Sequence, residues 1–202
     1  MVDNAYTMIR ELKQYAKENN VPIMNDEGID FLTTFVIKYQ ITNVLEIGTA
    51  IGFSAISMAL ANPKLKITTI ERDENRYLEA VKNIKKFNLE DRITLLFNDA
   101  LEIKVDDEFD LIFIDAAKGQ NRKFFEKFEK NLSSNGFIIT DNMKFHGYVD
   151  KDESEIKNRN LRGLVKKIKQ YRVFLEENEE YKTKFYDLGD GIAVSTKENR
   201  SI

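Results

Sequence analysis

The sequence of 202 residues contains no cysteine, no tryptophan, one histidine and two prolines. Without cysteine the chain can form no disulfide bond, no thiolate zinc site and no cysteine nucleophile. The single His146 also excludes a zinc site built from several histidines. Any metal ion bound by this chain must therefore be held by oxygen atoms.

Long apolar runs are also missing. The first 20 residues are polar and amphipathic, without the apolar stretch that follows a basic head in a secretion signal. No later run approaches the roughly 18 apolar residues of a membrane-spanning helix. We therefore expect a cytoplasmic protein with no membrane partner.

The length suits one globular domain with a substantial core. No internal repeat, low-complexity tract or Pro/Gly-rich linker divides the chain. We predict a single domain over residues 1–202, in which residues 1–40 form an N-terminal helical cap and residues 41–202 form the core.

Five short apolar runs alternate with longer amphipathic stretches. The runs are rich in Ile, Val and Phe, as in strands covered on both faces, and span residues 44–47, 67–70, 93–97, 109–114 and 137–140. The spacing of apolar residues predicts helices over residues 3–17, 26–38, 53–62, 75–87, 122–131 and 153–175. Right-handed crossovers would turn this series into a parallel sheet with helices on both faces.

The segment TKFYDLGDGIAVSTK predicts two further strands joined by a Gly-Asp-Gly turn. A hairpin at this point would add antiparallel strands to the parallel sheet. The predicted fold is therefore α/β, with a seven-stranded, mostly parallel sheet and two extra N-terminal helices. Functional residues of such a sheet are expected at the carboxyl ends of its strands.

The first strand ends in LEIGTAIG, which contains Glu46, Gly48 and Gly52 and leads into a helix. Glycines here would let a ligand approach the backbone and leave the helix N-terminus open. The spacing differs from the G-x-G-x-x-G dinucleotide fingerprint, and a purely structural tight turn is an equal interpretation. The second strand ends at Glu71, an acid that could accept both ribose hydroxyls of a nucleoside cofactor. Alternatively, Glu71 is a solvated acid at a helix N-terminus.

Carboxylates end three further strands: Asp99, Asp115 and Asp141. A carboxylate there is costly unless it is paired or solvated. Asp115, Asp141 and the neighbouring Asn142 could supply three oxygen ligands to Mg²⁺. The alternative is that each of these residues caps a helix N-terminus.

These motifs together resemble the class I S-adenosylmethionine-dependent methyltransferases, specifically the metal-dependent O-methyltransferases that include the catechol and caffeoyl-CoA enzymes. The I-D-x-x-K element at Asp115 and the T-D-N element at Asp141 are specific to that family. The resemblance runs from VPIMNDEG at residue 21 to the terminal strand, and is greatest to the bacterial tRNA 5-hydroxyuridine methyltransferases. It implies a Rossmann-like class I methyltransferase fold.

The resemblance also implies a cofactor set, a metal set and a catalytic pair. Glu46, Gly48 and Ser54 would surround the methionine moiety of S-adenosylmethionine, Glu71 the ribose, Asp99 and Ala100 the adenine, with Asp115 facing the cofactor and Met24 in a lid. Asp115, Asp141 and Asn142 would bind Mg²⁺ or Mn²⁺. Lys118 and Asp115 are the predicted catalytic residues. Lys118, three residues after Asp115, could take the acceptor's proton or stabilise its oxyanion; the alternative is an ordinary surface lysine at the start of a basic helix.

Two features bear on the acceptor. Ala116 and Ala117 stand where the catechol enzymes carry bulky aromatic groups, which favours a more open site. Residues 118–172 contain 14 Lys and Arg against 7 Asp and Glu, a net charge of +7, whereas the rest of the chain carries −10. A basic segment beside the predicted metal site favours the tRNA anticodon stem-loop as partner. A solvated helical face with paired lysines is the alternative.

Aromatic and basic residues after the fifth strand could contact a splayed nucleotide, namely Phe145, Tyr148 and Arg159. His146 is a surface or RNA-contacting residue rather than a catalytic base, because no triad partner is evident. Other interpretations are a small-molecule catechol or caffeoyl-CoA O-methyltransferase, a nicotinamide-dependent oxidoreductase and a catalytically silent nucleoside- or RNA-binding module. The resemblance and the extra helices also predict a homodimer.

Overall fold

A computed structural model describes residues 2–197 of the chain. The chain divides into two compact units, Met1–Ile103 and Lys104–Ile202, which are described separately below. The prediction of one domain over residues 1–202 stays a prediction.

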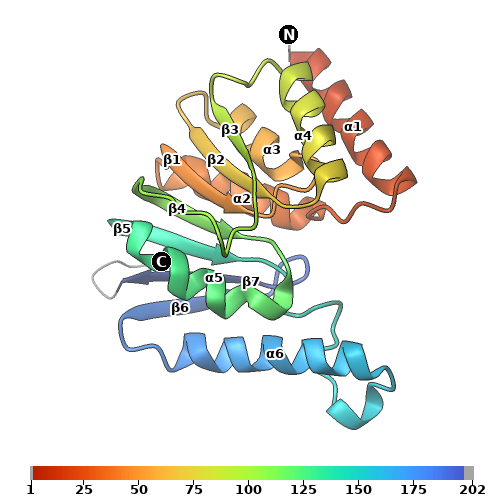
Figure 1. The fold of residues 1–202 in the computed structure, drawn as a ribbon, viewed down its shortest axis with the longest axis vertical. Helices are drawn as coiled ribbons and strands as arrows, with labels where there is room; N and C mark the ends of the chain where they lie inside the picture. Colours follow the sequence, from red (N-terminus) through yellow and green to blue (C-terminus); the bar gives the residue numbers. More distant parts are fainter. Residues whose placement is uncertain (1, 198–202) are drawn as a thin grey trace. The chain divides into compact units, whose positions relative to one another are not determined.

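Unit 1 contains three parallel strands and four helices (Figure 1). The strands lie in the order β3-β2-β1, and the register pairs Ile47 with Ile70 and Glu71 with Phe97. The carboxyl ends of all three strands therefore lie at one edge. In chain order the elements are α1 (Val2–Glu18), α2 (Asp26–Lys38), β1 (Asn43–Ile47), α3 (Phe53–Ala61), β2 (Lys66–Glu71), α4 (Glu74–Lys86) and β3 (Ile93–Phe97).

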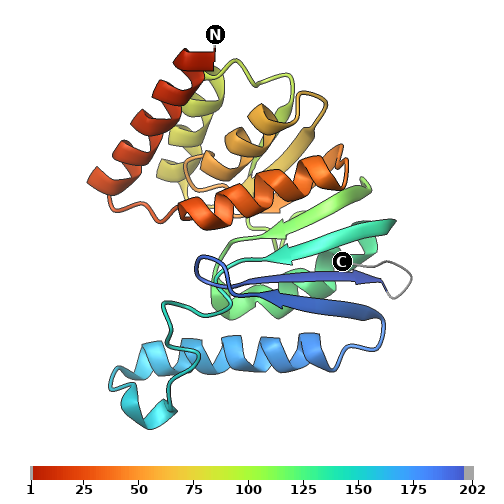
Figure 2. The ribbon, with the colours of Figure 1, turned by 180° about the vertical axis from the view of Figure 1, so that it is seen from behind.

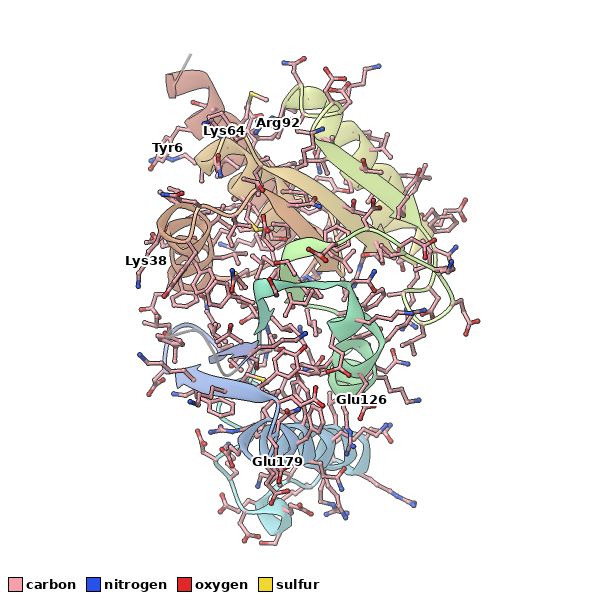
Figure 3. The ribbon with its side chains drawn as sticks, turned by 90° about the vertical axis from the view of Figure 1, so that its left-hand side faces the viewer. Tyr6, Lys38, Lys64, Arg92, Glu126 and Glu179 are labelled. Atoms are coloured by element: carbon pink, nitrogen blue, oxygen red, sulfur yellow. The ribbon has the colours of Figure 1, made fainter. Side chains whose placement is uncertain are left out.

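Polar side chains fasten the helices of this unit. Lys86 of α4 pairs with Glu11 of α1 at 2.6 Å, and the two helices lie side by side in Figures 1 and 2. Arg92, which is labelled in Figure 3, donates from Nη1 to the carbonyl oxygens of Ala59 and Asn62. Because the last carbonyls of a helix have no partner within it, Arg92 stabilises the end of α3.

Unit 2 contains a mixed sheet in the order β4-β5-β7-β6. Strands β4 and β5 are parallel, whereas β7 is antiparallel to both β5 and β6. Figure 2 shows α6 running along β6. Its elements are β4 (Phe109–Ile114), η1 (Lys118–Gln120), α5 (Asn121–Phe128), η2 (Glu129–Asn131), β5 (Leu132–Thr140), η3 (Glu153–Glu155), α6 (Arg159–Glu176), β6 (Tyr181–Tyr186) and β7 (Ile192–Lys197).

Aromatic packing joins the helices and the sheet of unit 2. The ring of Phe125 on α5 meets Tyr171 and Phe174 of α6 and Tyr181 of β6 edge-on, with centroids 5.1 to 6.5 Å apart. The hydroxyl of Tyr171 is also hydrogen-bonded to Thr140 at 2.9 Å. Such aromatic pairs each contribute about 0.5–1.5 kcal/mol beyond the area they bury. Together with the Tyr171–Thr140 bond, they fix α6 against β5, whose last residue, Thr140, precedes Asp141.

The predicted α/β fold is confirmed in its strands, its terminal hairpin and its N-terminal helices. Three element boundaries differ from the prediction. The helix expected over residues 122–131 ends at Phe128 and is followed by the 3-10 turn η2, and the strand expected over residues 137–140 begins at Leu132. The helix expected over residues 153–175 begins only at Arg159, because the Asn158 side chain accepts from the backbone N–H groups of Asn160 and Leu161 and so starts the helix there. Within residues 2–197, no helix is both long and apolar enough to cross a membrane.

Replacement of the α6 cap tests this boundary. Asn158→Ala removes both cap bonds and should lower the free energy of unfolding by about 1 kcal/mol. For a chain of this size, the melting temperature should fall by about 2–4 °C. The matched control is Asn160→Ala, which changes an exposed residue of the same helix and should not lower the melting temperature. Equal losses in the two variants would contradict the cap.

Candidate active site

The turn after β1 brings the backbone into an unusual conformation. Gly48, Ala50 and Gly52 all have positive φ angles, of 98°, 48° and 86°. The N–H groups of Gly48 and Thr49 both donate to the Ile70 carbonyl at the end of β2. Gly52 then starts α3 without any side-chain cap. The first N–H groups of α3 are thus left for another partner, as at helix N-termini that bind anions.

A buried carboxylate lies beneath this turn. Glu46 is fully buried, and its carboxylate accepts hydrogen bonds from the hydroxyls of Ser54 and Thr69. The Thr69 hydroxyl also bonds Thr49 at 2.6 Å. Of the predicted cofactor set, Glu46, Gly48 and Ser54 are therefore brought together. The hydroxyl donors Thr49 and Thr69 were missed, since no motif marks them and only the strand register reveals them.

Glu71 is held by the backbone rather than by solvent. Its side chain is buried, and the carboxylate accepts from the N–H groups of Ala50 at 2.8 Å, Arg72 at 2.9 Å and Asp73 at 2.8 Å. Asp73, not Glu71, caps helix α4. The alternative of a solvated acid is thus wrong, and the carboxylate is held in one orientation by three backbone donors. Its contact with a ribose stays a prediction.

The remaining cofactor residues of unit 1 occupy different surroundings. Asp99 is partly exposed, pairs with Arg72 at 3.2 Å and accepts from the Leu101 N–H at 2.8 Å. Ala100 is buried. Met24 is also buried and packs against α2, where a Cβ on Gly28 would lie 2.8 Å from its Cγ. A contact of these residues with the cofactor stays a prediction.

The ends of β4 and β5 bring the predicted metal residues together in unit 2. Ile114 pairs with Thr140, so Asp115 and Asp141 follow neighbouring positions, and the Asp141 N–H donates to the Ile114 carbonyl at 3.2 Å. Lys118 donates from Nζ to Asp115 Oδ1 at 2.5 Å. Asp115, Asp141 and Asn142 cap none of the described helices. The capping alternative is therefore wrong for these residues.

The charges at this edge are not balanced. Burial, the carboxylate of Asp115 and more weakly that of Asp190 raise the pKa of Asp141 to about 7, against the opposing effects of Lys118 and of the Asn142 backbone. In residues 2–197, no three His, Cys, Asp or Glu side chains cluster as a metal site. Two carboxylates and an amide oxygen nevertheless suit Mg²⁺, which keeps several water ligands and would offset the repulsion.

The basic helix reaches this edge through Lys167. A Cβ on Gly119 would lie 3.2 Å from Lys167 Cδ and 3.7 Å from its Nζ, so this lysine lies directly beside the turn that carries Lys118. The positive charge of this segment was predicted from the sequence, but Lys167 was not singled out. His146 is exposed, whereas Phe145 and Tyr148 pack in part against an apolar cluster of α6. The proposed RNA contacts of these residues stay predictions.

Comparison with known proteins identifies the family. Residues 2–198 match the model of the O-methyltransferase family. The chain is 27% identical over 190 residues to caffeoyl-CoA O-methyltransferase of Populus kitakamiensis, covering 90% of this chain and 80% of the relative. The chain therefore belongs to the O-methyltransferase family, as an S-adenosylmethionine-dependent enzyme of the caffeoyl-CoA O-methyltransferase type.

Solved structures agree with this assignment. A Staphylococcus aureus protein named for caffeoyl-CoA O-methyltransferase is 37% identical with a TM-score of 0.89, covering 94% of this chain and 91% of that chain. A Bacillus cereus O-methyltransferase in complex with S-adenosylhomocysteine is 26% identical with a TM-score of 0.79, covering 95% and 91%. The predicted family and Rossmann-like fold are confirmed. The closer relationship to tRNA methyltransferases stays a prediction.

Glu71 offers a test of the cofactor half. Glu71→Ala removes the acceptor proposed for the ribose hydroxyls and the acceptor of three backbone N–H groups. Hydrogen bonds to a charged group contribute about 1.5–3 kcal/mol. S-adenosylmethionine should therefore bind at least about 10-fold more weakly. Isothermal titration calorimetry measures the affinity. Glu74→Ala, at an exposed acid in the first turn of α4, is the control and should bind as the wild type does. Unchanged affinity of Glu71→Ala would remove Glu71 from the site.

Proposed function

We propose that this O-methyltransferase is divalent-metal-dependent and methylates 5-hydroxyuridine at the wobble position of tRNA, giving 5-methoxyuridine. The main support for the proposal is the group of charged residues at the carboxyl ends of β4 and β5. There, the two carboxylates Asp115 and Asp141 lie beside a lysine bonded to one of them, and a basic helix borders the same turn.

The residues divide the chemistry between them. S-adenosylmethionine supplies an electrophilic methyl group, and a divalent cation supplies positive charge beside the acceptor oxygen. Asp115, Asp141 and Asn142 would hold the cation. Lys118, whose Nζ donates to Asp115, would stabilise the oxyanion left when the acceptor's hydroxyl loses its proton, or, with Nζ as the neutral amine, would take that proton itself. The turn from Gly48 and the carboxylate of Glu71 orient the methyl donor.

The acceptor must suit a site with hard oxygen ligands. The 5-hydroxyl and 4-oxo oxygens of 5-hydroxyuridine are adjacent and can approach one cation together, as the two oxygens of a catechol can. Ala116 and Ala117 carry only methyl groups, so neither can form an aromatic clamp for a flat catechol. Ala116 is half-buried and Ala117 is exposed, which leaves this position open. An open approach of this kind suits a nucleotide that remains part of a larger molecule.

The charge beside the site supports an RNA acceptor. Lys167 lies next to Gly119, and Lys123 and Lys166 are exposed on α5 and α6. Some neighbouring cations are engaged within the protein: Arg122 pairs with Glu126, labelled in Figure 3, at 2.8 Å. The exposed lysines would attract the phosphate backbone, a contact that weakens steeply with salt. A tRNA anticodon stem-loop is therefore the proposed partner, and the predicted homodimer stays a prediction.

A second candidate acceptor is a small catechol or acyl-CoA substrate. The names of the Populus and Staphylococcus relatives favour it, because both refer to caffeoyl-CoA O-methyltransferase. Caffeoyl groups also carry two adjacent oxygens, so the same metal residues and the same Lys118 would serve this reaction. The two candidates differ only in what surrounds the reacting hydroxyl.

Direct assay of both acceptors separates the candidates. The protein is incubated with methyl-labelled S-adenosylmethionine, Mg²⁺ and tRNA from cells that cannot make 5-methoxyuridine, and the nucleosides are analysed by mass spectrometry. Label is expected in 5-methoxyuridine and absent with Lys118→Met. Parallel reactions contain catechol or caffeoyl-CoA. Rapid methylation of either one without label in the RNA would overturn the tRNA proposal in favour of the second candidate.

Metal removal tests the mechanism. A chelator and Asp141→Ala should each abolish methyl transfer while S-adenosylmethionine still binds, because the cation acts on the acceptor oxygen. Mg²⁺ at about 100 times its Kd should also raise the free energy of unfolding of the wild type by about 2.7 kcal/mol, measured by thermal melting. Asp150→Ala, at an exposed acid beyond the same strand, should keep both responses. Full turnover in chelator would disprove the metal role.

A further inference from the structure

The turn between β6 and β7 holds the segment that follows the predicted metal ligands. The Lys144 N–H donates to the Asp190 carbonyl at 2.8 Å, and the Met143 N–H donates to the Gly191 carbonyl at 2.9 Å. The His146 N–H donates to Asp190 Oδ1 at 2.5 Å. Three N–H groups just beyond Asn142 are thus fixed by residues far along the chain.

The contact is close, and the segment that it holds is strained. Gly191 has a φ of +84°, and a Cβ there would lie 2.8 Å from Lys144 Cγ and 3.0 Å from its backbone nitrogen. Asn142, Phe145 and His146 have φ angles of 63°, 47° and 55°, in the left-handed region. Each such residue costs on the order of 1–3 kcal/mol and persists only when its surroundings enforce it. The turn supplies that enforcement.

Among the described residues, the second carboxylate oxygen of Asp190, Oδ2, makes no hydrogen bond that would stabilise the fold. Within residues 2–197, Oδ2 is buried without a hydrogen-bond partner, and the side chain as a whole is 15% exposed. Within the described part of the chain, Oδ2 lies 3.7 Å from Nδ1 of the exposed His146, too far for a hydrogen bond. A buried oxygen without a donor costs about 1–3 kcal/mol.

We infer that Asp190 is a positioning residue for the proposed cation site: its carbonyl and Oδ1 fix the segment after Asn142, and its buried Oδ2 places negative charge beside that segment. The inference rests on the metal part of the proposed function. Outer-shell groups of this kind orient metal ligands and tune the affinity for the ion. Asp190 need not touch the cation to act in this way.

A neighbouring acid provides the matched control. Asp187 lies on the same turn and carries the same charge, but its side chain is 81% exposed and pairs with Lys144. Asp187→Asn and Asp190→Asn therefore change the net charge equally, and only the second removes a largely buried charge next to the segment after Asn142. The Asp190→Asn side chain keeps an oxygen that can accept from the His146 N–H.

Mn²⁺ binding is measured by the loss of the free-ion electron paramagnetic resonance signal, without cofactor or acceptor. We expect Asp190→Asn to raise the Kd for Mn²⁺ by about 10-fold, the lower end of outer-shell effects. Asp187→Asn should change it by less than about 2-fold, as expected for an exposed, screened charge. Wild-type affinity in Asp190→Asn, or equal losses in the two variants, would overturn the inference.

Further arms keep the result interpretable. If Asp190→Asn loses its folded circular dichroism spectrum, Asp190→Ser, which keeps a hydroxyl acceptor, replaces it with the same expectation. Because the titration contains no RNA, failure of tRNA methylation leaves the inference standing. A wild-type chain that binds no Mn²⁺ would overturn both the inference and the metal part of the proposed function.

Discussion

The cost of keeping carboxylates at the ends of buried strands governs this molecule. In unit 1 that cost is offset internally: hydroxyls of Ser54 and Thr69 donate to Glu46, and three backbone N–H groups donate to Glu71. Charge-assisted hydrogen bonds of this kind are roughly twice as strong as neutral ones. The acids of unit 1 are therefore part of the structure that shapes the turn after β1.

The carboxylates of unit 2 have fewer hydrogen-bond donors than those of unit 1 in the interactions described above. Asp115 accepts a hydrogen bond from Lys118. Asp141 is buried, and its burial and the charges of Asp115 and Asp190 raise its pKa to about 7. Such an arrangement is unfavourable for the isolated fold, because burial and like charge both disfavour the ionised carboxylate. The divalent cation proposed above would reverse this balance.

The sequence predicted much of this arrangement because strand ends combine two local signals, a continuous apolar run and an abrupt polar residue. Asp115, Asp141 and Asn142 were identified in this way. The start of α6 was predicted too early, because residues 153–155 continue the helical spacing of α6. The true start depends on the Asn158 cap. Asp190 lay in a turn motif that predicts a hairpin. Its contacts with the segment after Asn142 follow only from the pairing of β5 with β7.

The link between His146 and Asp190 joins positions 44 residues apart, which affects the order in which the molecule can assemble. A nascent chain must extend past Asp190 before the segment beyond Asn142 can reach its final backbone conformation. Contacts of such separation form late, because the closure of the intervening loop must be paid for first. The segment beyond Asn142 therefore reaches its final conformation only after the terminal hairpin has formed.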